Sequence, residues 1–214
     1  MNNIAVIDYG MGNLRSVEKA LQRVAPAACV RVSSDPATIA RADRVVFPGV
    51  GAMPDCLREL ASRGLREAVV EAARRKPFLG ICLGMQALFE SSAEGGVAGL
   101  GVLPGKVVRF PREKMIDAAG AKLKVPHMGW NEVEPTRAHP LWRGLDPGTR
   151  FYFVHSYYVA MEPEQIRAGL SRYPYAFTCA VARDNMFAVQ FHPEKSQAAG
   201  LALLGNFAAW DGCG

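Results

Sequence analysis

The stretch PFLGICLGMQ, Pro77–Gln86, decides how the rest of the chain is organised. Its first half is a short apolar run of the kind that forms a buried parallel strand. After Cys82 the apolar residues return at helical spacing, which predicts a helix over 84–90. Gly80 and Gly84 flank the cysteine two residues to either side. This glycine-x-nucleophile-x-glycine layout is typical of a strand–turn–helix elbow, with sulfur where a hydrolase carries a hydroxyl.

An elbow of this kind would make Cys82 a nucleophile. The turn strains the backbone of the central residue and crowds its neighbours, so that only glycine fits beside it. The N-terminus of the following helix favours the thiolate, which is the form that attacks. The alternative is a buried core cysteine, the commonest fate of a lone cysteine. Two glycines at elbow spacing favour the nucleophile.

Bulk properties limit the class of protein. A chain of 214 residues at ordinary composition suits a single domain over 1–214. No apolar run approaches the ~18 residues of a membrane span, and the N-terminus lacks the pattern of a signal peptide. The five cysteines show neither a disulfide framework nor metal-ligand spacing. We therefore expect a cytoplasmic protein with free thiols, no membrane partner and no metal.

The first half of the chain alternates strands and helices. Strands are predicted over 4–8, 29–32, 44–47 and 77–81, and one helical segment is predicted from Pro54 to about Lys76. This rhythm indicates an α/β fold, a three-layer doubly wound and mostly parallel sheet. Ligands bind such sheets at the carboxyl ends of the strands. Cys82 and the loop Gly49-Val50-Gly51 both lie at such ends and can face each other.

After position 91 the chain reads as strands joined by short turns, over 102–110, 150–159, 168–171, 177–182 and 186–190. We expect an antiparallel extension or mixed edge of the same sheet, with a hairpin turn at Asp184-Asn185 and a closing helix over 196–210. The basic segment 106–124 is interpreted as a solvated loop or hairpin, and a docking surface is the second reading. Without stacking aromatics, and at a net charge of only +5, nucleic acid is not expected as a partner.

A cysteine nucleophile needs a base, and the base needs a group that orients it. His192 and Glu194 follow the last predicted strand in the sequence Gln190-Phe191-His192-Pro193-Glu194. Pro193 stiffens the backbone between them and keeps the imidazole and the carboxylate on one side of the chain. Glu194 can then accept a hydrogen bond from one ring nitrogen while the other nitrogen faces a thiol.

Three motifs together carry a resemblance to a known family: PGVG over 48–51, GICLGMQ over 80–86 and QFHPE over 190–194. In this order they resemble the class I, triad-type glutamine amidotransferases. Further segments, IDYGMGNLRSV over 7–17, PHMGWN over 126–131 and FVHSYY over 153–158, are similar to the glutaminase subunits of imidazole glycerol phosphate synthases. Met53 and Ala188 depart from the pattern without touching the triad.

The resemblance implies roles for particular residues. Cys82, His192 and Glu194 would be the catalytic triad that hydrolyses L-glutamine to glutamate and ammonia through a thioester. The oxyanion would be held by the backbone of Leu83 and of the loop Gly49-Val50-Gly51. The substrate would be bound by four residues: Gly51, Gln86, Ser156 and Tyr157. No cofactor is implied.

The resemblance also implies a partner, because free ammonia is protonated in the cytosol and the chain has no recognisable second substrate site. The acceptor would be a (β/α)8-barrel cyclase subunit that makes imidazole glycerol phosphate and aminoimidazole carboxamide ribotide in histidine biosynthesis. Residues 127–131 and Lys195 would lie at or near the interface with that subunit.

Two alternatives stay open at this stage. One is a glutaminase subunit of another synthase, such as pyridoxal phosphate synthase, against which the PHMGWN segment argues. The other is a cysteine peptidase or an inactive interaction module on the same fold. A peptidase needs an open cleft for an extended chain, and an inactive module would be expected to lack a triad residue.

Overall fold

The computed structural model describes residues 2–117, 119–160 and 164–213 of the chain. The helices are α1 (Leu14–Val24), α2 (Pro36–Arg41), α3 (Met53–Ser62), α4 (Arg66–Arg75), α5 (Leu83–Ala87) and α6 (Gln197–Ala209). The strands of the first half are β1 (Asn3–Ile7), β2 (Cys29–Ser33), β3 (Arg44–Gly49), β4 (Phe78–Cys82), β5 (Phe89–Ser92) and β6 (Val97–Ala98). Those of the second half are β7 (Leu103–Arg109), β8 (His127–Pro135), β9 (Thr149–His155), β10 (Tyr157–Ala160), β11 (Arg167–Arg172), β12 (Ala176–Arg183) and β13 (Met186–Val189).

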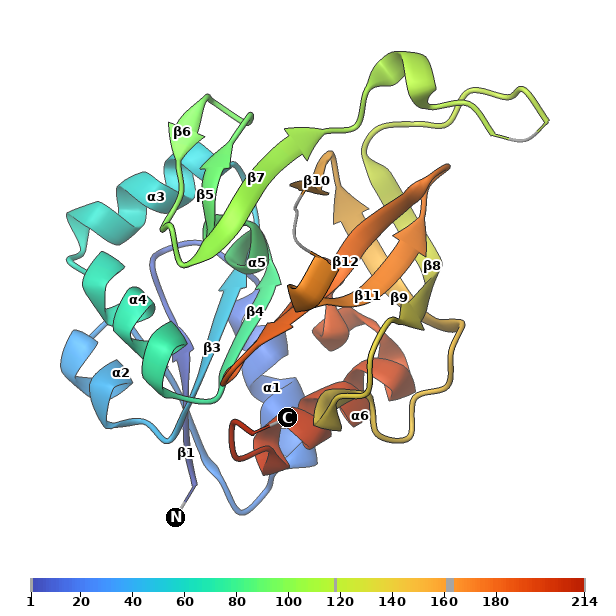
Figure 1. The fold of residues 1–214 in the computed structure, drawn as a ribbon. Coiled ribbons are helices and arrows are strands. Elements are labelled where there is room, and N and C mark those ends of the chain that lie inside the picture. Colours follow the sequence, from blue (N-terminus) through green and yellow to red (C-terminus); the bar gives the residue numbers. More distant parts are fainter. Residues whose placement is uncertain (1, 118, 161–163, 214) are drawn as a thin grey trace.

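One sheet runs through the molecule in the order β2-β1-β3-β4-β13-β12-β10-β7-β5-β6 (Figure 1). Strands β2, β1, β3, β4 and β13 are mutually parallel, and β12 and β10 continue the sheet in antiparallel fashion. Strands β11, β8 and β9 branch from β12. The predicted doubly wound, mostly parallel sheet with an antiparallel extension is confirmed.

The parallel half is buried on both faces, which explains its nearly continuous apolar strands. Alternate residues of β1 point to opposite sides: Ile4 and Val6 pack with α1 and α6, whereas Ala5 and Ile7 pack with α2, α3 and α4. Helix α2 is capped at its N-terminus, since the carboxylate of Asp35 accepts hydrogen bonds from two backbone N–H groups of its first turn.

Two helical predictions were wrong in their extent. The helix expected over 54–76 is two helices, because the chain turns between α3 and α4 at Gly64, whose φ is +64°. The helix expected over 84–90 ends at Ala87, and Phe89 already begins β5. Met85, Leu88 and Phe89 are all fully buried, so their apolar spacing reflects burial from every side and not a helical face.

The second half also differs from the expectation in three places. The last strand, β13, does not lie at an edge: it is inserted beside β4, with Val189 opposite Ile81. The strand expected over 150–159 is broken at Ser156 into β9 and β10. The nine-residue strand β8 was not predicted at all, because its glycine, proline and polar residues obscure the alternation.

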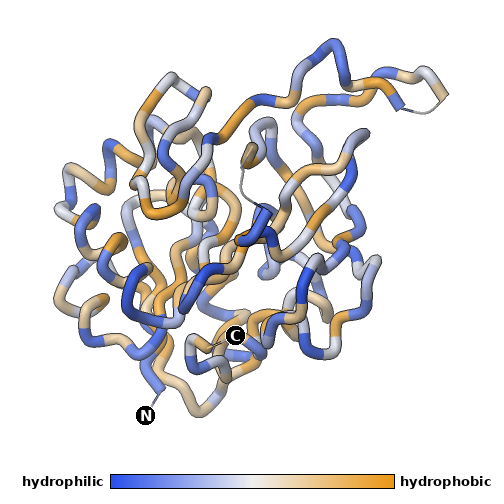
Figure 2. The backbone as a smooth tube through the Cα atoms, in the orientation of Figure 1, coloured by the Kyte–Doolittle hydropathy of each residue, from blue (hydrophilic) through white to orange (hydrophobic). Residues whose placement is uncertain are grey.

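Hydrophobic residues gather along the interior strands, while hydrophilic residues follow the outer turns (Figure 2). The segment between β7 and β8 projects from the body of the molecule (Figure 1). Its basic side chains Arg112, Lys114, Lys122 and Lys124 are exposed, in agreement with the solvated hairpin that the sequence predicted. None of the helices described is both long and apolar enough to cross a membrane.

Candidate active site

Strand β4 and helix α5 meet at Cys82, where the chain reverses within one residue. Cys82 has φ +54° and ψ −111°, a conformation that non-glycine residues rarely adopt. The turn is possible because its neighbours are glycines: a Cβ on Gly84 would lie 1.9 Å from the carbonyl oxygen of Phe47, and one on Gly80 would lie 3.0 Å from Ala188 Cβ. The elbow predicted from the sequence is therefore present. Its helix has only five residues, so its dipole contributes less to the thiol than expected.

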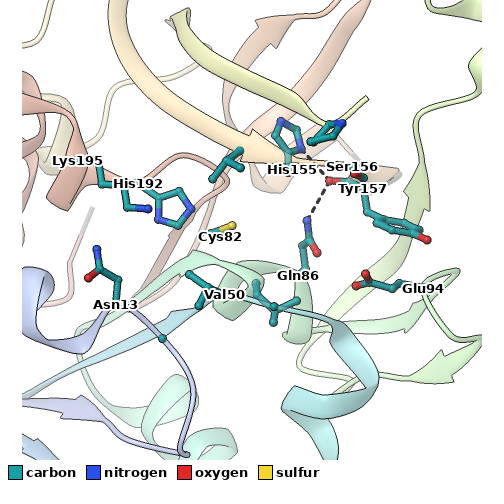
Figure 3. A pocket seen from close by; sticks show the side chains of 15 residues that line it. Asn13, Val50, Cys82, Gln86, Glu94, His155, Ser156, Tyr157, His192 and Lys195 are labelled. Carbon is teal, nitrogen blue, oxygen red and sulfur yellow. Dashed lines mark hydrogen bonds between the residues drawn. The ribbon is translucent and has the colours of Figure 1, made fainter. Parts of the chain in front are cut away.

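His192 reaches Cys82 because β13 lies parallel to β4 and both strands end at the same edge of the sheet. Its Nδ1 is 2.9 Å from Oε1 of Glu194, and both side chains are 1% exposed. Its Nε2 makes no direct hydrogen bond among the described residues. Figure 3 shows the ring beside the sulfur of Cys82. The structure thus brings together the three residues that the sequence placed in a triad.

The electrostatics of this group favour a charged imidazole. Burial of the ring opposes protonation, but the Cys82 thiolate in front of it and the Glu194 carboxylate behind it outweigh that effect and raise the pKa of His192 to about 10. A protonated His192 stabilises the thiolate and holds the proton that a leaving amine needs.

The Gly49-Val50-Gly51 loop continues from β3, whose last residue pairs with Cys82 in the sheet. Val50, Gly51 and Leu83 line the cavity, whereas Gly49 lies behind it, where a Cβ would be 2.8 Å from the backbone nitrogen of Gly84. Burial raises the pKa of the Tyr9 phenol, Cys56 adds to that shift, and the Val50 backbone N–H opposes it.

A cavity of about 610 Å³ opens in front of the sulfur, a volume that suits a small ligand. Gln86, Ser156 and Tyr157, the substrate residues expected from the sequence, all line it (Figure 3). The break between β9 and β10 is what turns Ser156 into the cavity. Gln86 is nearly buried, and its Nε2 donates hydrogen bonds to the backbone oxygen of Tyr157 at 3.0 Å and to Oε1 of Gln190 at 2.9 Å.

Sequence reasoning missed several polar residues of the site. Asn13, Glu94 and His155 line the cavity, and the buried Gln190 lies behind it with its Nε2 3.7 Å from the sulfur of Cys82. Gln190 could have been found, since it stands two residues before His192 at the end of the same strand. The others come from loops and from a strand end whose register the sequence does not reveal. Within the described ranges, no cluster of His, Cys, Asp and Glu side chains could hold a metal ion.

Comparison with known proteins places this geometry in context. The family described as Glutamine amidotransferase class-I matches residues 5–209. The HisH subunit of imidazole glycerol phosphate synthase from Thiobacillus denitrificans is 65% identical over 98% of this chain and 92% of its own length. The HisH subunit from Nitrosospira multiformis is 63% identical over 98% of this chain and 99% of its own length.

Solved structures share the fold at low sequence identity. A putative GMP synthase subunit from Thermoplasma acidophilum superposes with a TM-score of 0.69 at 21% identity, over 98% of this chain and 93% of that one. The structure of PurLQS from Thermotoga maritima gives a TM-score of 0.70 at 17% identity, over 96% of each chain.

Proposed function

The chain belongs to the class I glutamine amidotransferases and, among them, to the HisH subunits of imidazole glycerol phosphate synthase, and on this premise we propose that it is the glutaminase subunit of that synthase in histidine biosynthesis. The observation that carries the proposal is that Cys82 and His192 line one small cavity while Glu194 contacts the imidazole of His192 from behind. We further propose that residues 1–214 act as one amidotransferase domain.

In the proposed first half-reaction, the thiolate of Cys82 attacks the side-chain amide carbon of glutamine. A sulfur–carbon bond forms, and the carbon–nitrogen bond breaks as His192 donates its Nε2 proton to the departing ammonia. Glu194 holds Nδ1 of the imidazole and so fixes the orientation of the ring. Leu83 and the Gly49-Val50-Gly51 loop are the proposed source of backbone donors for the tetrahedral oxyanion, each worth roughly 3 kcal/mol.

In the second half-reaction, water adds to the thioester carbon while His192 accepts its proton. Collapse of the adduct breaks the sulfur–carbon bond, releases glutamate and restores the Cys82 thiolate. The proposed role of Gln86, Ser156 and Tyr157 is to bind the amino acid, and of Gly51 to border it; their position around the cavity supports this role.

We assign the ammonia to a partner subunit, the (β/α)8-barrel cyclase that would make imidazole glycerol phosphate and aminoimidazole carboxamide ribotide. The large hydrophobic side chains that are exposed in the described part of the chain all come from residues 116–130: Ile116, Met128 and Trp130. Pro126, two residues before Met128, lines the cavity in front of Cys82, and so does Lys195. Met128 and Trp130 lie on one face of β8, and this exposed apolar pair supports docking of the cyclase beside the cavity. Within the expected interface segment 127–131, the side chain of His127 is buried, whereas Met128 and Trp130 are exposed.

The docking proposal is tested by replacing Trp130 or Met128 with alanine and measuring the affinity for the purified cyclase subunit by calorimetry. Each loss of a buried anchor should raise the Kd by about tenfold or more. Lys19→Ala, exposed on α1, is the control that should leave the Kd unchanged. Parental affinity in both patch variants would exclude this face.

The glutaminase proposal is tested by measuring ammonia release from glutamine, with and without the cyclase subunit. Cys82→Ser should abolish release, whereas Cys213→Ser, which changes an exposed thiol outside the cavity, should not. Stimulation by a pyridoxal phosphate synthase instead would favour another amidotransferase subunit. Cleavage of peptides would favour a peptidase, and no turnover with any partner would favour an inactive module.

A further inference from the structure

A continuous chain of hydrogen bonds leads from strand β8 to the sulfur of Cys82. It begins with Nδ2 of Asn131, 3.2 Å from Nε2 of His127, and passes to His155, whose Nε2 lies 2.9 Å from Nδ1 of His127. Nδ1 of His155 then lies 2.8 Å from the backbone oxygen of Tyr157. This carbonyl also accepts the hydrogen bond from Gln86, which continues the chain to Gln190 and the sulfur.

The directions of the bonds from Gln86 to the sulfur follow from one atom, the carbonyl oxygen of Tyr157, which can only accept. Gln86 must therefore turn its NH₂ group toward it, and the second hydrogen of that group points to Gln190. Gln190 must then present its oxygen to Gln86. Its own NH₂ group is left facing Sγ of Cys82 at 3.7 Å. The side-chain amide of Gln190 is thus oriented by its partners.

The hydrogen bonds of the two histidines can also be given a direction. Nδ1 of His155 faces the carbonyl oxygen of Tyr157 and must therefore carry the hydrogen. Burial lowers the pKa of His155 to about 3, so the ring is neutral and its Nε2 is unprotonated and accepts. His127 must then donate from Nδ1. Burial lowers its pKa to about 4, and its Nε2 accepts from Asn131. Both rings are neutral, and their hydrogens point toward the carbonyl oxygen of Tyr157, to which Gln86 also donates.

We propose that Gln190 is a further catalytic residue, whose side-chain amide donates a hydrogen bond to the Cys82 thiolate, and that His155 and His127 are positioning residues that fix the Tyr157 carbonyl, which in turn orients Gln86 and Gln190. The inference rests on the proposed role of Cys82 as nucleophile. A hydrogen bond to an ionised acceptor is about twice as strong as a neutral one. Because Gln190 is completely buried, water cannot replace the donor when it is removed.

Thiolate content can be read without turnover, from the rate at which iodoacetamide alkylates Cys82 in the full-length protein, resolved by peptide mass spectrometry. Gln190→Met keeps the length of the side chain and removes the donor. At neutral pH its Cys82 should react about tenfold more slowly or worse, with the pH profile displaced upward. The exposed Cys213 is the internal reference, and Gln22→Met, on the exposed face of α1, is the matched control.

Turnover gives a second readout of the same variant. With the cyclase subunit present, Gln190→Met should lower kcat while KM for glutamine stays near the parental value. The reason is that the Gln190 amide stabilises the Cys82 thiolate and does not contact the bound glutamine. A folded Gln190→Met protein with the parental alkylation profile would overturn the inference. That result would leave the proposed function intact.

The positioning role is tested at His155. His155→Asn places an amide NH₂ where Nδ1–H stood and should keep most of the parental alkylation rate. His155→Leu has no donor there and should lower the rate toward that of Gln190→Met. In the double variant His155→Leu/Gln190→Met, leucine should cause little further loss, since it acts through Gln190. Equal losses in the asparagine and leucine variants would contradict the positioning role. A parental protein whose Cys82 is alkylated normally but which never frees ammonia would instead contradict the proposed function.

Discussion

At the scale of single residues, the site depends on one backbone conformation and one pair of charges. Cys82 occupies a left-handed conformation that lifts its sulfur out of the sheet and toward the cavity. The imidazole of His192 faces that sulfur only because β13 and β4 are neighbours. Glu194, nearly inaccessible to solvent, supplies the compensating charge on the far side of the ring.

Glu194→Gln tests that compensating charge. The amide keeps the shape of the side chain but removes the negative charge that helps to hold His192 protonated, so the pKa of His192 should fall. A charge-assisted hydrogen bond of about 1.5–3 kcal/mol is lost, and kcat should drop by about ten- to a hundredfold. Steady-state ammonia release in the complex measures this. Glu71→Gln, on the exposed face of α4, is the control, and parental kcat in Glu194→Gln would contradict an orienting role.

The triad residues found from the sequence share one property: each stands in a short motif at the end of an apolar strand. Cys82, His192 and Glu194 could be predicted for this reason. His155 and Gln190 could not be assigned their contacts, because those contacts cross between strands far apart in sequence. The orientation of an amide depends on all its neighbours together, and sequence spacing carries no information about it.

At the scale of elements, the parallel half was predicted more accurately than the antiparallel half. Strands buried on both faces read as continuous apolar runs, and β1, β3 and β4 were found in nearly the correct places. Strand β8 was missed because one of its faces is exposed and its sequence is irregular. The insertion of β13 beside β4 depends on long-range pairing that local patterns do not encode.

Helix α6 offers a matched pair of substitutions that tests how the site is supported. A Cβ on Gly200 would lie 1.8 Å from the carbonyl oxygen of Pro193, whereas one on Gly205 would make an ordinary 3.7 Å contact with Val24. Gly200→Ala should therefore destabilise the fold by about 1–3 kcal/mol or more and displace the turn that carries His192 and Glu194. Gly205→Ala should stabilise it by up to about 1 kcal/mol.

Urea unfolding of both alanine variants gives the free energies, and ammonia release reports on the turn. Activity should fall in Gly200→Ala and stay at the parental value in Gly205→Ala. Equal stabilities for the two variants would show that α6 does not pack against the 193–195 turn as the structure has it.

At the scale of the whole molecule, buried histidines set the pH dependence of stability. Burial lowers the pKa of His127 and His139 to about 4 and that of His155 to about 3, from an ordinary value of 6.5. Between pH 6.5 and these lowered pKa values, the unfolded chain binds protons on these histidines that the folded chain does not. The free energy of unfolding therefore falls as the pH falls from about 6.5 to about 4. Three such groups give a slope of at most about 4 kcal/mol per pH unit.

His192 has the opposite sign. Its pKa is raised, so the stability it contributes is complete below 6.5 and is lost as the pH rises toward about 10. Urea midpoints measured from pH 4 to 10 should therefore be highest near pH 6.5. His139→Asn retains an acceptor for the N–H of Leu141 and should flatten the acid limb. An unchanged acid limb in that variant would show that the ring of His139 titrates normally.

The whole molecule also explains why the chemistry needs a second subunit. The cavity suits one small amino acid. Met128 and Trp130 are exposed on β8, and Pro126, just before β8, lines the cavity. A glutaminase that releases ammonia into solvent loses it to protonation, whereas one covered by its acceptor does not. Under the proposed function, product release and partner docking share the edge of the sheet at which Cys82 lies.

The central claim is that Cys82 carries the glutamyl group during turnover. Acid quenching of the complex while it consumes glutamine, followed by peptide mass spectrometry, measures this directly. The account predicts a single glutamyl thioester on the peptide that contains Cys82, and none in Cys82→Ser. A glutamyl group on another residue, or parental ammonia release by Cys82→Ser, would contradict it.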